Sequence, residues 1–163
     1  MNTEELVKWL LIGAGATAAT DIWAVARKHL VGAALPNYRL VGRWVAHLIH
    51  GRFRHDSIAA APAMRGEAVI GWVTHYAVGM GFALLLPASA GSGWIRQPTL
   101  MPALWVGIGT VLAPFLVMQP AMGAGFFASR TPRPGAARLQ SLMNHAVFGL
   151  GLFITAKLLS TGG

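Results

Sequence analysis

Apolar residues along this chain form four long blocks separated by polar segments, rather than alternating with polar residues one by one. A helix needs roughly 20 mostly apolar residues to cross the hydrocarbon core of a bilayer. The blocks predict four spans, at about residues 6–26, 68–88, 100–124 and 139–159. We therefore expect an all-α membrane protein in which residues 1–163 form a single four-helix transmembrane domain.

Composition supports a membrane protein and excludes several kinds of site. Of the 163 residues, 55% are hydrophobic and 11% are charged, whereas a soluble domain usually carries about 25% charged residues. The chain has no cysteine, which excludes disulfides, thiolate metal sites and cysteine nucleophiles. The net charge of +8 is better explained by basic loops on a cytoplasmic membrane face than by nucleic acid, so we expect no nucleic-acid partner.

The distribution of Lys and Arg predicts the orientation of the spans. Ten of the 13 basic residues fall in two loops, seven within residues 27–65 and three within residues 130–138. The other three are Lys8, Arg96 and Lys157. Because basic loops stay in the cytoplasm, we expect a multi-pass protein of the bacterial inner membrane with both termini in the periplasm.

The long basic loop, residues 27–65, contains a predicted amphipathic helix. Its apolar residues recur at helical spacing from Leu40 to Ile49, which is typical of a helix lying in the headgroup layer. We interpret this helix as a membrane-surface anchor, with recognition of an anionic ligand or lipid headgroup as the alternative. The residues predicted on its basic face are Arg39, Arg43, His47, His50 and Arg54.

Two of the predicted spans share a pattern that indicates an internal repeat. In the second and fourth spans, His75 and His145 are each followed by glycine four and six residues later. The first and third spans share a Gly-x-Gly pattern, beginning at Gly13 and at Gly107. The pattern predicts a duplicated helical hairpin, with the first and second spans equivalent to the third and fourth.

Small residues and prolines predict local features of the spans. Gly79 and Gly149 should allow neighbouring helices to approach closely, because small residues serve this purpose in membranes. Pro114 and Pro120 should kink or break the third span, because proline lacks the N–H that the helix needs.

Polar side chains inside the spans are expensive and therefore need an explanation. In the predicted topology five of them gather in the cytoplasmic half of the spans and His75 lies nearer the middle, an arrangement that predicts an inward-opening polar pocket. Its members are Asp21, Glu67, His75, Gln119, Asn144 and His145. Structural roles are open at each position: Asp21 can pair with nearby basic residues, Glu67 can complement its helix dipole, and the others can hydrogen-bond between helices.

Several local strings resemble a known family. They are Ala18–Trp23, Asn37-Tyr38, Gly42–Trp44, Glu67 with Gly71-Trp72 and His75-Tyr76, Met118–Gly123, and Ser129–Pro132. Together they resemble a bacterial inner-membrane family catalogued as domain of unknown function 2938, over nearly the whole chain. The resemblance implies a four-helix membrane protein and implies no activity.

Four functions fit this sequence. Small-solute or proton-coupled transport through the polar pocket is favoured, with Asp21 and His145 handling protons and a homodimer supplying the pathway. A structural or accessory membrane subunit is the main alternative. Haem or metal held by His75 and His145 is a further one, although we expect no cofactor. An embedded enzyme is the last, but the sequence contains no recognisable catalytic motif and we name no catalytic residue.

Overall fold

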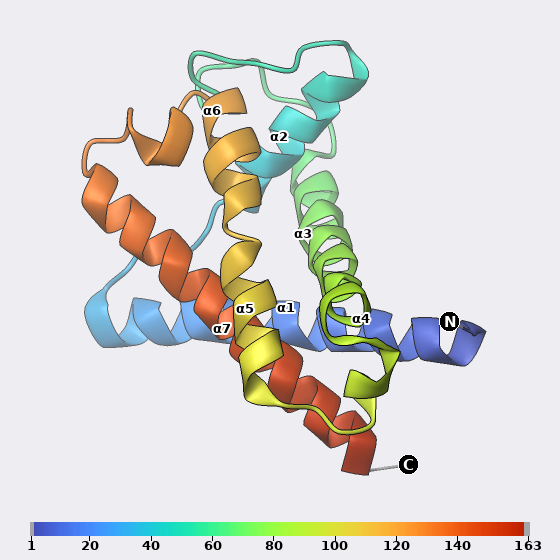
Figure 1. Ribbon diagram of the computed structural model, residues 1–163. Helices are drawn as coiled ribbons and strands as arrows, with labels where there is room; N and C mark the ends of the chain where they lie inside the picture. The colour runs from blue at the N-terminus through green and yellow to red at the C-terminus, as the bar shows by residue number, and fades with distance from the viewer. Residues whose placement is uncertain (1, 162–163) are drawn as a thin grey trace. The chain divides into compact units, whose positions relative to one another are not determined.

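The computed structural model describes residues 2–161, and every regular element within this range is helical (Figure 1). The elements are α1 (Thr3–Val31), α2 (Tyr38–Ile49), α3 (Glu67–Ala83), α4 (Leu85–Ala90), η1 (Ser92–Ile95), α5 (Leu100–Gly109), η2 (Pro114–Met118), α6 (Gln119–Ala121), η3 (Phe126–Ala128) and α7 (Pro134–Thr161).

Four helical stretches are long and apolar enough to cross a membrane, which confirms the predicted all-α architecture with four transmembrane helices. They are Thr3–Val31, Glu67–Ala90, Leu100–Ala121 and Pro134–Thr161. Most are longer than hydropathy predicts, because polar capping groups decide where a helix ends. In α1, the Asn2 side chain accepts a hydrogen bond from the Glu5 backbone N–H at 2.8 Å, and Gly32 closes the other end with a left-handed φ of 66°.

The third span is broken where the prolines predict. The α-helical ladder of α5 ends at Gly109, and a π-helical segment begins at Pro114 and ends at Met118. Pro120 lies in the short α6 that follows. Proline removes a backbone donor and crowds the preceding turn, so the ladder shifts register at these positions.

Contacts divide the chain into two compact units. Unit 1 consists of the described residues within Met1–Leu35, Tyr76–Thr110 and Met143–Gly163. Unit 2 consists of Pro36–His75 and Val111–Leu142. Because α3 and α7 each contribute residues to both units, we describe the packing within each unit separately.

Glycines set the helix crossings of unit 1. A Cβ atom at Gly13 of α1 would lie 2.8 Å from the Gly79 carbonyl oxygen of α3, and one at Gly107 of α5 would lie 2.6 Å from the Gly149 backbone nitrogen of α7. A Cβ atom at Gly149 would in turn lie 2.9 Å from the Ala103 carbonyl oxygen. These contacts confirm that Gly79 and Gly149 let neighbouring helices approach closely.

The core of unit 1 fills the space beside these crossings. Trp9 and Trp94 stack there with ring centroids 5.9 Å apart, and Phe82 meets Phe148 edge to face. The buried members of the core are Trp9, Ile12, Ala16, Ala83, Leu86, Trp94, Ile95, Ala103, Phe148, Leu152 and Ala156. Small and large residues therefore alternate in this core, which suits close helix packing.

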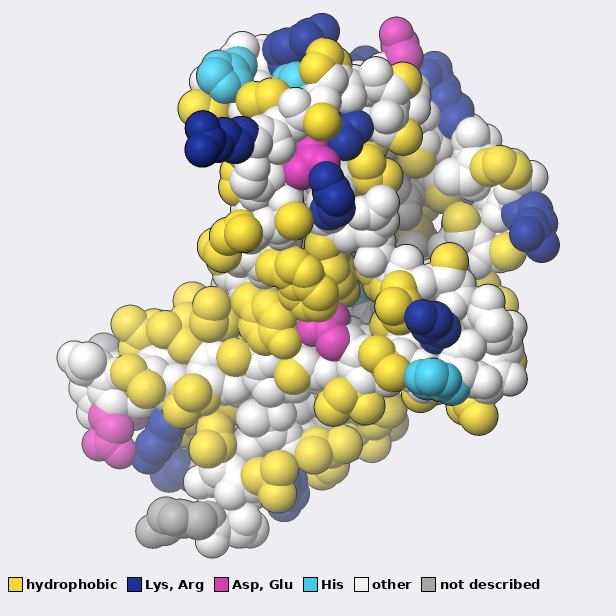
Figure 2. Space-filling view, turned by 180° about the vertical axis from the view of Figure 1, so that it is seen from behind, with side chains coloured by type: hydrophobic (Ala, Val, Ile, Leu, Met, Phe, Trp, Pro, Cys, Tyr) yellow, Lys and Arg dark blue, Asp and Glu magenta, His cyan; other side chains and the backbone are white. Residues whose placement is uncertain are grey.

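Large hydrophobic side chains also lie on the outside of the helices, as a lipid-facing surface requires. Figure 2 shows hydrophobic side chains over wide areas of the face in view. The large hydrophobic residues that are more than 60% exposed include Val69 and Val73 on α3, Trp105 on α5 and Leu158 on α7. In water such surface would be costly, whereas lipid tails solvate it.

Unit 2 packs α2 tightly against the first part of α3. A Cβ atom at Gly42 would clash with the Glu67 carbonyl and lie 2.9 Å from its carbon, and one at Gly71 would clash with the Tyr38 carbonyl oxygen. The buried residues of α2 are Gly42, Ala46 and His47. This close approach brings the basic residues of α2 to the first turn of α3.

Candidate functional site

The polar centre of unit 2 is a carboxylate held by two arginines. Glu67 is 3% exposed and begins α3. Its Oε2 accepts hydrogen bonds from Arg43 Nε at 2.8 Å and from the Met64 backbone N–H at 3.0 Å. Its Oε1 accepts from Arg39 Nη2 at 3.0 Å and from Arg43 Nη2 at 3.1 Å. We call Arg39, Arg43 and Glu67 the arginine–glutamate cluster.

The two arginines of this cluster differ in environment. The Arg43 side chain is 14% exposed and that of Arg39 is 65% exposed. The hydrogen bond to Glu67 raises the pKa of the Arg43 guanidinium above its ordinary value, although burial opposes this effect. Arg43 also donates through Nη1 to the Ala61 carbonyl at 3.0 Å, so it joins Glu67 to the loop before α3.

The five residues predicted on the basic face of α2 therefore have different surroundings. Arg39 and Arg43 bind Glu67, and His47 is 4% exposed with its Nε2 3.1 Å from the Pro62 carbonyl oxygen. The prediction is wrong for His50 and Arg54, because α2 ends at Ile49 and these two exposed residues lie beyond the helix. A role for these residues in recognising an anionic ligand stays a prediction, and Glu67 already partners two of them.

The remaining predicted residues of unit 2 lie in two further contacts. His75 stacks on Tyr38 with ring centroids 4.1 Å apart, and Trp72 meets Tyr38 edge to face at 4.7 Å. Gln119 donates through Nε2 to the Ser141 hydroxyl at 3.5 Å. Within the described chain, the Gln119 Oε1 atom is buried without a hydrogen-bond partner.

Unit 1 contains the two remaining ionisable residues of the predicted pocket. The Tyr76 hydroxyl donates to Asp21 Oδ2 at 3.1 Å, joining α1 to α3. The His145 Nδ1 atom lies 2.9 Å from the Thr110 hydroxyl oxygen and 3.3 Å from the Gly107 carbonyl oxygen, joining α7 to the end of α5. Asn144 precedes His145 on α7, and both residues are partly buried.

The structure thus places the six predicted pocket residues in two sets of three. Asp21, Asn144 and His145 belong to unit 1, whereas Glu67, His75 and Gln119 belong to unit 2. Within unit 1, Asp21 lies six residues before Arg27, or roughly 9 Å along the helix at 1.5 Å per residue. That one pocket contains all six residues stays a prediction.

Sequence reasoning missed the partners of these residues. Tyr76, Thr110 and Ser141 each provide a hydroxyl group to a predicted site residue. A signal was present for Tyr76 and Thr110, because hydroxyl-bearing residues inside a span need a partner. Their pairing with Asp21 and His145 depends on which helices cross, which the sequence pattern does not specify.

The contacts of His75 and His145 give limited support to a metal or haem site. Among residues 2–161, no group of three or more His, Cys, Asp or Glu side chains is placed to hold a metal ion. The His145 Nδ1 is already hydrogen-bonded to Thr110, which leaves Nε2 as its ligating atom. Haem or metal binding at His75 and His145 stays an alternative, because two histidines are fewer than the three side chains that such a group requires.

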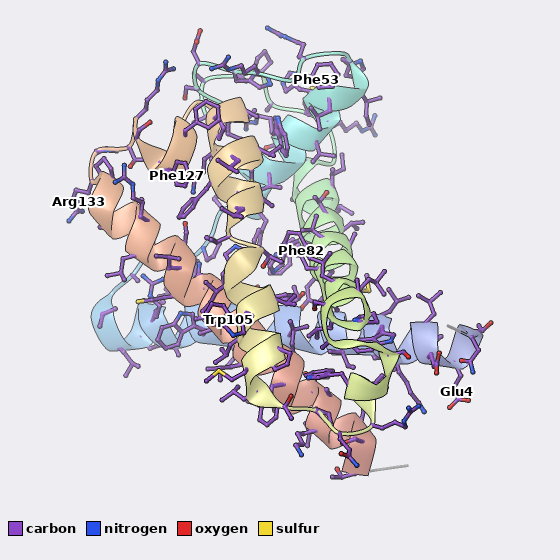
Figure 3. The ribbon with its side chains drawn as sticks, viewed as in Figure 1. Glu4, Phe53, Phe82, Trp105, Phe127 and Arg133 are labelled. Atoms are coloured by element: carbon purple, nitrogen blue, oxygen red, sulfur yellow. The ribbon has the colours of Figure 1, made fainter. Side chains whose placement is uncertain are left out.

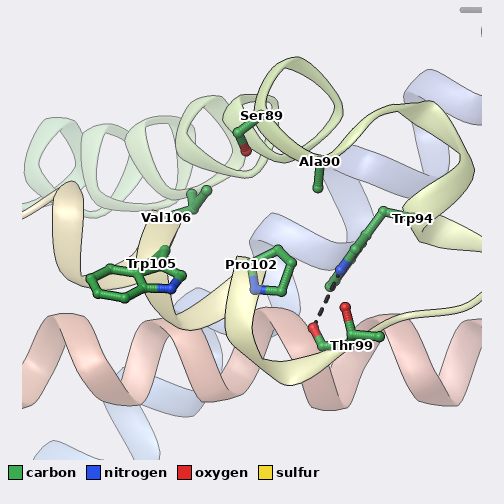
Figure 4. Close-up of a pocket in the computed structure, with 7 residues that line it drawn as sticks. All are labelled: Ser89, Ala90, Trp94, Thr99, Pro102, Trp105 and Val106. Carbon is green, nitrogen blue, oxygen red and sulfur yellow. Dashed lines mark hydrogen bonds between the residues drawn. The ribbon is translucent and has the colours of Figure 1, made fainter.

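An apolar groove in unit 1 is the other surface feature. It has a volume of about 590 Å³ and lies between α4, η1 and α5. Its lining residues are Ser89, Ala90, Trp94, Thr99, Pro102, Trp105 and Val106 (Figure 4). Trp94 donates through Nε1 to the Thr99 carbonyl at 3.3 Å. The groove contains no ionisable side chain, so it is not the polar pocket that the sequence predicts.

One known protein family matches nearly the whole chain. Residues 10–159 match the family described as "Protein of unknown function (DUF2938)". The chain belongs to this family. The match supports the resemblance found in the sequence, and the matched region includes most or all of each of the four membrane-spanning helices, together with the arginine–glutamate cluster. No curated protein and no solved structure matched the chain.

Proposed function

We propose that this protein moves a small solute or protons across the bacterial inner membrane, with Asp21 and His145 handling protons. The observation that carries this proposal is an ionisable side chain on each of two membrane-spanning helices. Asp21 of α1 and His145 of α7 are each hydrogen-bonded to a hydroxyl group of another helix, at 3.1 Å and 2.9 Å. Ionisable groups at such positions commonly mark ion and substrate pathways.

The partners suit groups that gain and lose protons. The Tyr76 hydroxyl can donate to an ionised Asp21 carboxylate, while the hydroxyl of Thr110 can either donate to or accept from His145 Nδ1. The hydroxyl partner in each of these two contacts is neutral, so it orients the ionisable group without placing an opposite charge beside it.

Proton flux in reconstituted vesicles tests this proposal. We expect a pH gradient across proteoliposomes to decay faster with the protein than without it, in a manner that Asp21→Asn and His145→Gln both abolish. Asp56→Asn is the matched control, because Asp56 is an exposed acid outside the spans. Equal decay with and without the wild-type protein, for protons and for a panel of small solutes, would sink the proposal.

A structural or accessory role is favoured by one specific observation. Both Asp21 and His145 are satisfied by neighbouring helices, as residues that only hold helices together would be. This role predicts that Asp21→Asn and Tyr76→Phe each lower the melting temperature in detergent while vesicles containing the wild-type protein show no flux. The two roles are therefore separated by the wild-type flux.

The orientation of the chain remains part of the proposal. Eight arginines and two acidic residues belong to unit 2, which contains most of the two basic loops. The exposed arginines of these loops include Arg52, Arg54, Arg65, Arg130 and Arg133. This excess supports a cytoplasmic location for these loops and periplasmic termini. Reporter fusions at the C-terminus and after residue 60 test it, and a cytoplasmic C-terminus would reverse the orientation.

Anionic lipid headgroups are the partner that this charge favours. All eight basic residues of unit 2 are arginines, whose planar guanidinium groups bind phosphate in a bidentate manner. Arg52, Arg54, Arg130 and Arg133 are exposed and suit this contact better than Arg39 and Arg43, which bind Glu67. Interaction with anionic lipid is worth about 1 kcal/mol per basic residue near the surface.

Lipid retention tests this partner. We expect native mass spectrometry to show phosphatidylglycerol retained over phosphatidylcholine, and an Arg130→Gln, Arg133→Gln double variant to lose that preference. Arg96→Gln, in unit 1, is the control. An unchanged preference in the double variant would exclude these two arginines as the headgroup contacts.

A homodimer and a duplicated hairpin complete the proposal. Four helices per chain are few for a pathway, which favours two copies, and light scattering in detergent tests the mass. Duplication is supported by the equivalent glycine crossings, Gly13 with Gly79 and Gly107 with Gly149. An interfacial position for α2, tested by the quenching of Trp44 fluorescence by lipid-borne quenchers, likewise stays a proposal.

A further inference from the structure

The loop that follows α2 is tied to that helix at several points. We define the latch loop as residues 51–62. Trp44 Nε1 donates to the Phe53 carbonyl at 3.1 Å, and Arg43 Nη1 donates to the Ala59 carbonyl at 3.2 Å. His47 Nε2 lies 3.1 Å from the carbonyl oxygen of Pro62. Three side chains of α2 therefore hold the two ends of the latch loop.

The middle of the latch loop is tied to the inner end of the third span. The His55 backbone N–H donates to the Ala121 carbonyl at 2.9 Å, and the Ile58 N–H donates to the Met122 carbonyl at 3.0 Å. Gly123 has a φ of 95°, and a Cβ atom there would clash with the Asp56 carbonyl. The latch loop thus joins α2 to the segment that ends the broken third span, entirely within unit 2.

Two histidines face each other where these attachments meet (Figure 3 shows the side chains of this region around Phe53). The rings of His47 and His55 lie 4.9 Å apart, and His47 is 4% exposed. The Nε2 atom of His55 is buried and, within the described chain, has no hydrogen-bond partner. A buried ring nitrogen without a donor is tolerated when the imidazole is neutral, because an aromatic nitrogen lone pair is less costly to bury than a charge.

The surroundings of His55 disfavour its protonated form. Burial lowers the pKa of His55 below its ordinary value, and His47 and Arg52 lower it further. The ring's hydrogen bond with the Arg52 backbone acts in the opposite direction. Arg43 of α2 binds the Ala59 carbonyl of the same loop, α6 brings no titratable side chain, and the acid next to His55, Asp56, is exposed.

We propose that the latch loop has a fastened form, bonded to the inner end of the third span, and a released form, detached from it. Protonation of His55 beside His47 converts the fastened form to the released form. A proton on Nε2 charges a ring that lies 4.9 Å from the ring of His47, and it makes a donor of a buried atom that has no acceptor within the described chain. Turning the ring towards water hydrates the charged imidazole and gives its N–H an acceptor. The loop must move to allow this rotation. The backbone bonds from His55 and Ile58 to the third span then open together.

The direction of the pH effect follows from linkage. His55 has a lower pKa in the fastened loop than in the released loop, so the released form binds more protons. The fastened form is therefore fully favoured above the ordinary histidine pKa of about 6.5 and is lost as the pH falls below it. Between the two pKa values, the ratio of released to fastened loop rises about tenfold for each unit of pH.

Hydrogen exchange of the full-length protein in detergent tests this proposal directly. We expect the His55 and Ile58 amides to lose protection between about pH 7.5 and 5.5, after correction for the intrinsic exchange rate. Amides of α5, which lie in unit 1, should keep their protection over the same range. In the His55→Met variant the buried nitrogen is removed, so the latch loop should stay protected at both pH values.

A matched variant and a second measurement keep the test decisive. His50→Gln alters an exposed histidine one residue beyond α2, and it should keep the pH dependence of the wild type. If His55→Met does not fold, the wild-type NMR titration of the His55 ring decides, since its midpoint must coincide with the loss of protection. Protection that does not change with pH, or a pH dependence that persists in His55→Met, would overturn the proposal.

Discussion

The crossing of α5 and α7 offers the sharpest test of the packing, because the two glycines of one Gly-x-Gly pattern have opposite surroundings. A Cβ atom at Gly107 would lie 2.6 Å from the Gly149 nitrogen and 2.8 Å from the His145 carbonyl oxygen. A Cβ atom at Gly109 would have no heavy atom within 4 Å. Gly107→Ala and Gly109→Ala therefore add the same methyl group to a closed and to an open position.

The contacts set the size of the effect. Ordinary van der Waals contact begins near 3.4 Å, so the helices must separate by more than half an ångström to admit the Gly107→Ala methyl group. The atoms in the way belong to the backbone of α7 and cannot rotate aside. Such overpacking costs about 1–3 kcal/mol. Gly109→Ala should instead be neutral or stabilise by up to about 1 kcal/mol, because alanine has the higher helix propensity.

The assay is reversible unfolding of the purified protein in mixed micelles, followed by circular dichroism. We expect Gly107→Ala to unfold at lower denaturant than wild type and Gly109→Ala at equal or higher denaturant. Gly149→Ala, whose Cβ would lie 2.9 Å from the Ala103 carbonyl oxygen, should resemble Gly107→Ala. Equal shifts for Gly107→Ala and Gly109→Ala would refute the argument that this glycine crossing limits the approach of the helices.

Three further substitutions probe other contacts. Thr110→Val removes the hydroxyl that lies 2.9 Å from His145 Nδ1 and should cost about 1 kcal/mol, measured by the same unfolding assay; a cost of zero would show that the contact contributes no net stability. Trp9→Ala empties a fully buried core position and should cost about 3–5 kcal/mol. Arg43→Gln should lower the melting temperature more than Arg39→Gln, because the Arg43 side chain is 14% exposed against 65% for Arg39; the reverse order would show that burial does not decide the strength of this cluster.

Hydropathy predicts the four spans because lipid demands a continuous apolar surface over a fixed length. Most helix ends extend beyond the prediction because they depend on capping rather than on apolarity, as the Asn2 side chain and Gly32 show for α1, whereas the third span ends at Ala121, before its predicted end. The break of the third span could be predicted, since Pro114 cannot continue an α-helical ladder. The break of the second span after Ala83 was not predicted, because only Pro87 hints at it and that proline lies inside α4.

The sequence indicates which polar residues in the spans need a partner, but it does not indicate which partner each one finds. Placing a charged or polar side chain in the membrane costs free energy unless that side chain has a partner. This cost draws attention to Asp21, Glu67 and His145. Which partner each of them finds depends on helix crossings and on the fold of the long loop. Glu67 illustrates this, since Arg39 and Arg43 precede it by 28 and 24 residues and reach it only because α2 packs on α3.

The amphipathic pattern of α2 shows why a pattern can indicate the right element and leave its packing undetermined. The pattern from Leu40 to Ile49 correctly indicates a helix, and α2 ends at Ile49. Yet the residues that α2 buries are Gly42, Ala46 and His47, not the bulky apolar ones. Small residues allow α2 to approach the backbone of α3, and this close approach brings Arg43 within reach of Glu67.

Close approach through small residues thus positions both the arginine–glutamate cluster and the contact between Thr110 and His145. In unit 2, Gly42 and Gly71 bring α2 to the first turn of α3, which positions Arg43 on Glu67. In unit 1, Gly107 brings α5 against α7, and the Thr110 hydroxyl one turn later then reaches the ring of His145. Substituting a glycine that closes a crossing should therefore alter the neighbouring polar contact and lower the stability, whereas substituting Gly109 should leave that contact unchanged and should not lower the stability. Glycine at these positions is part of the polar site, although it carries no functional group.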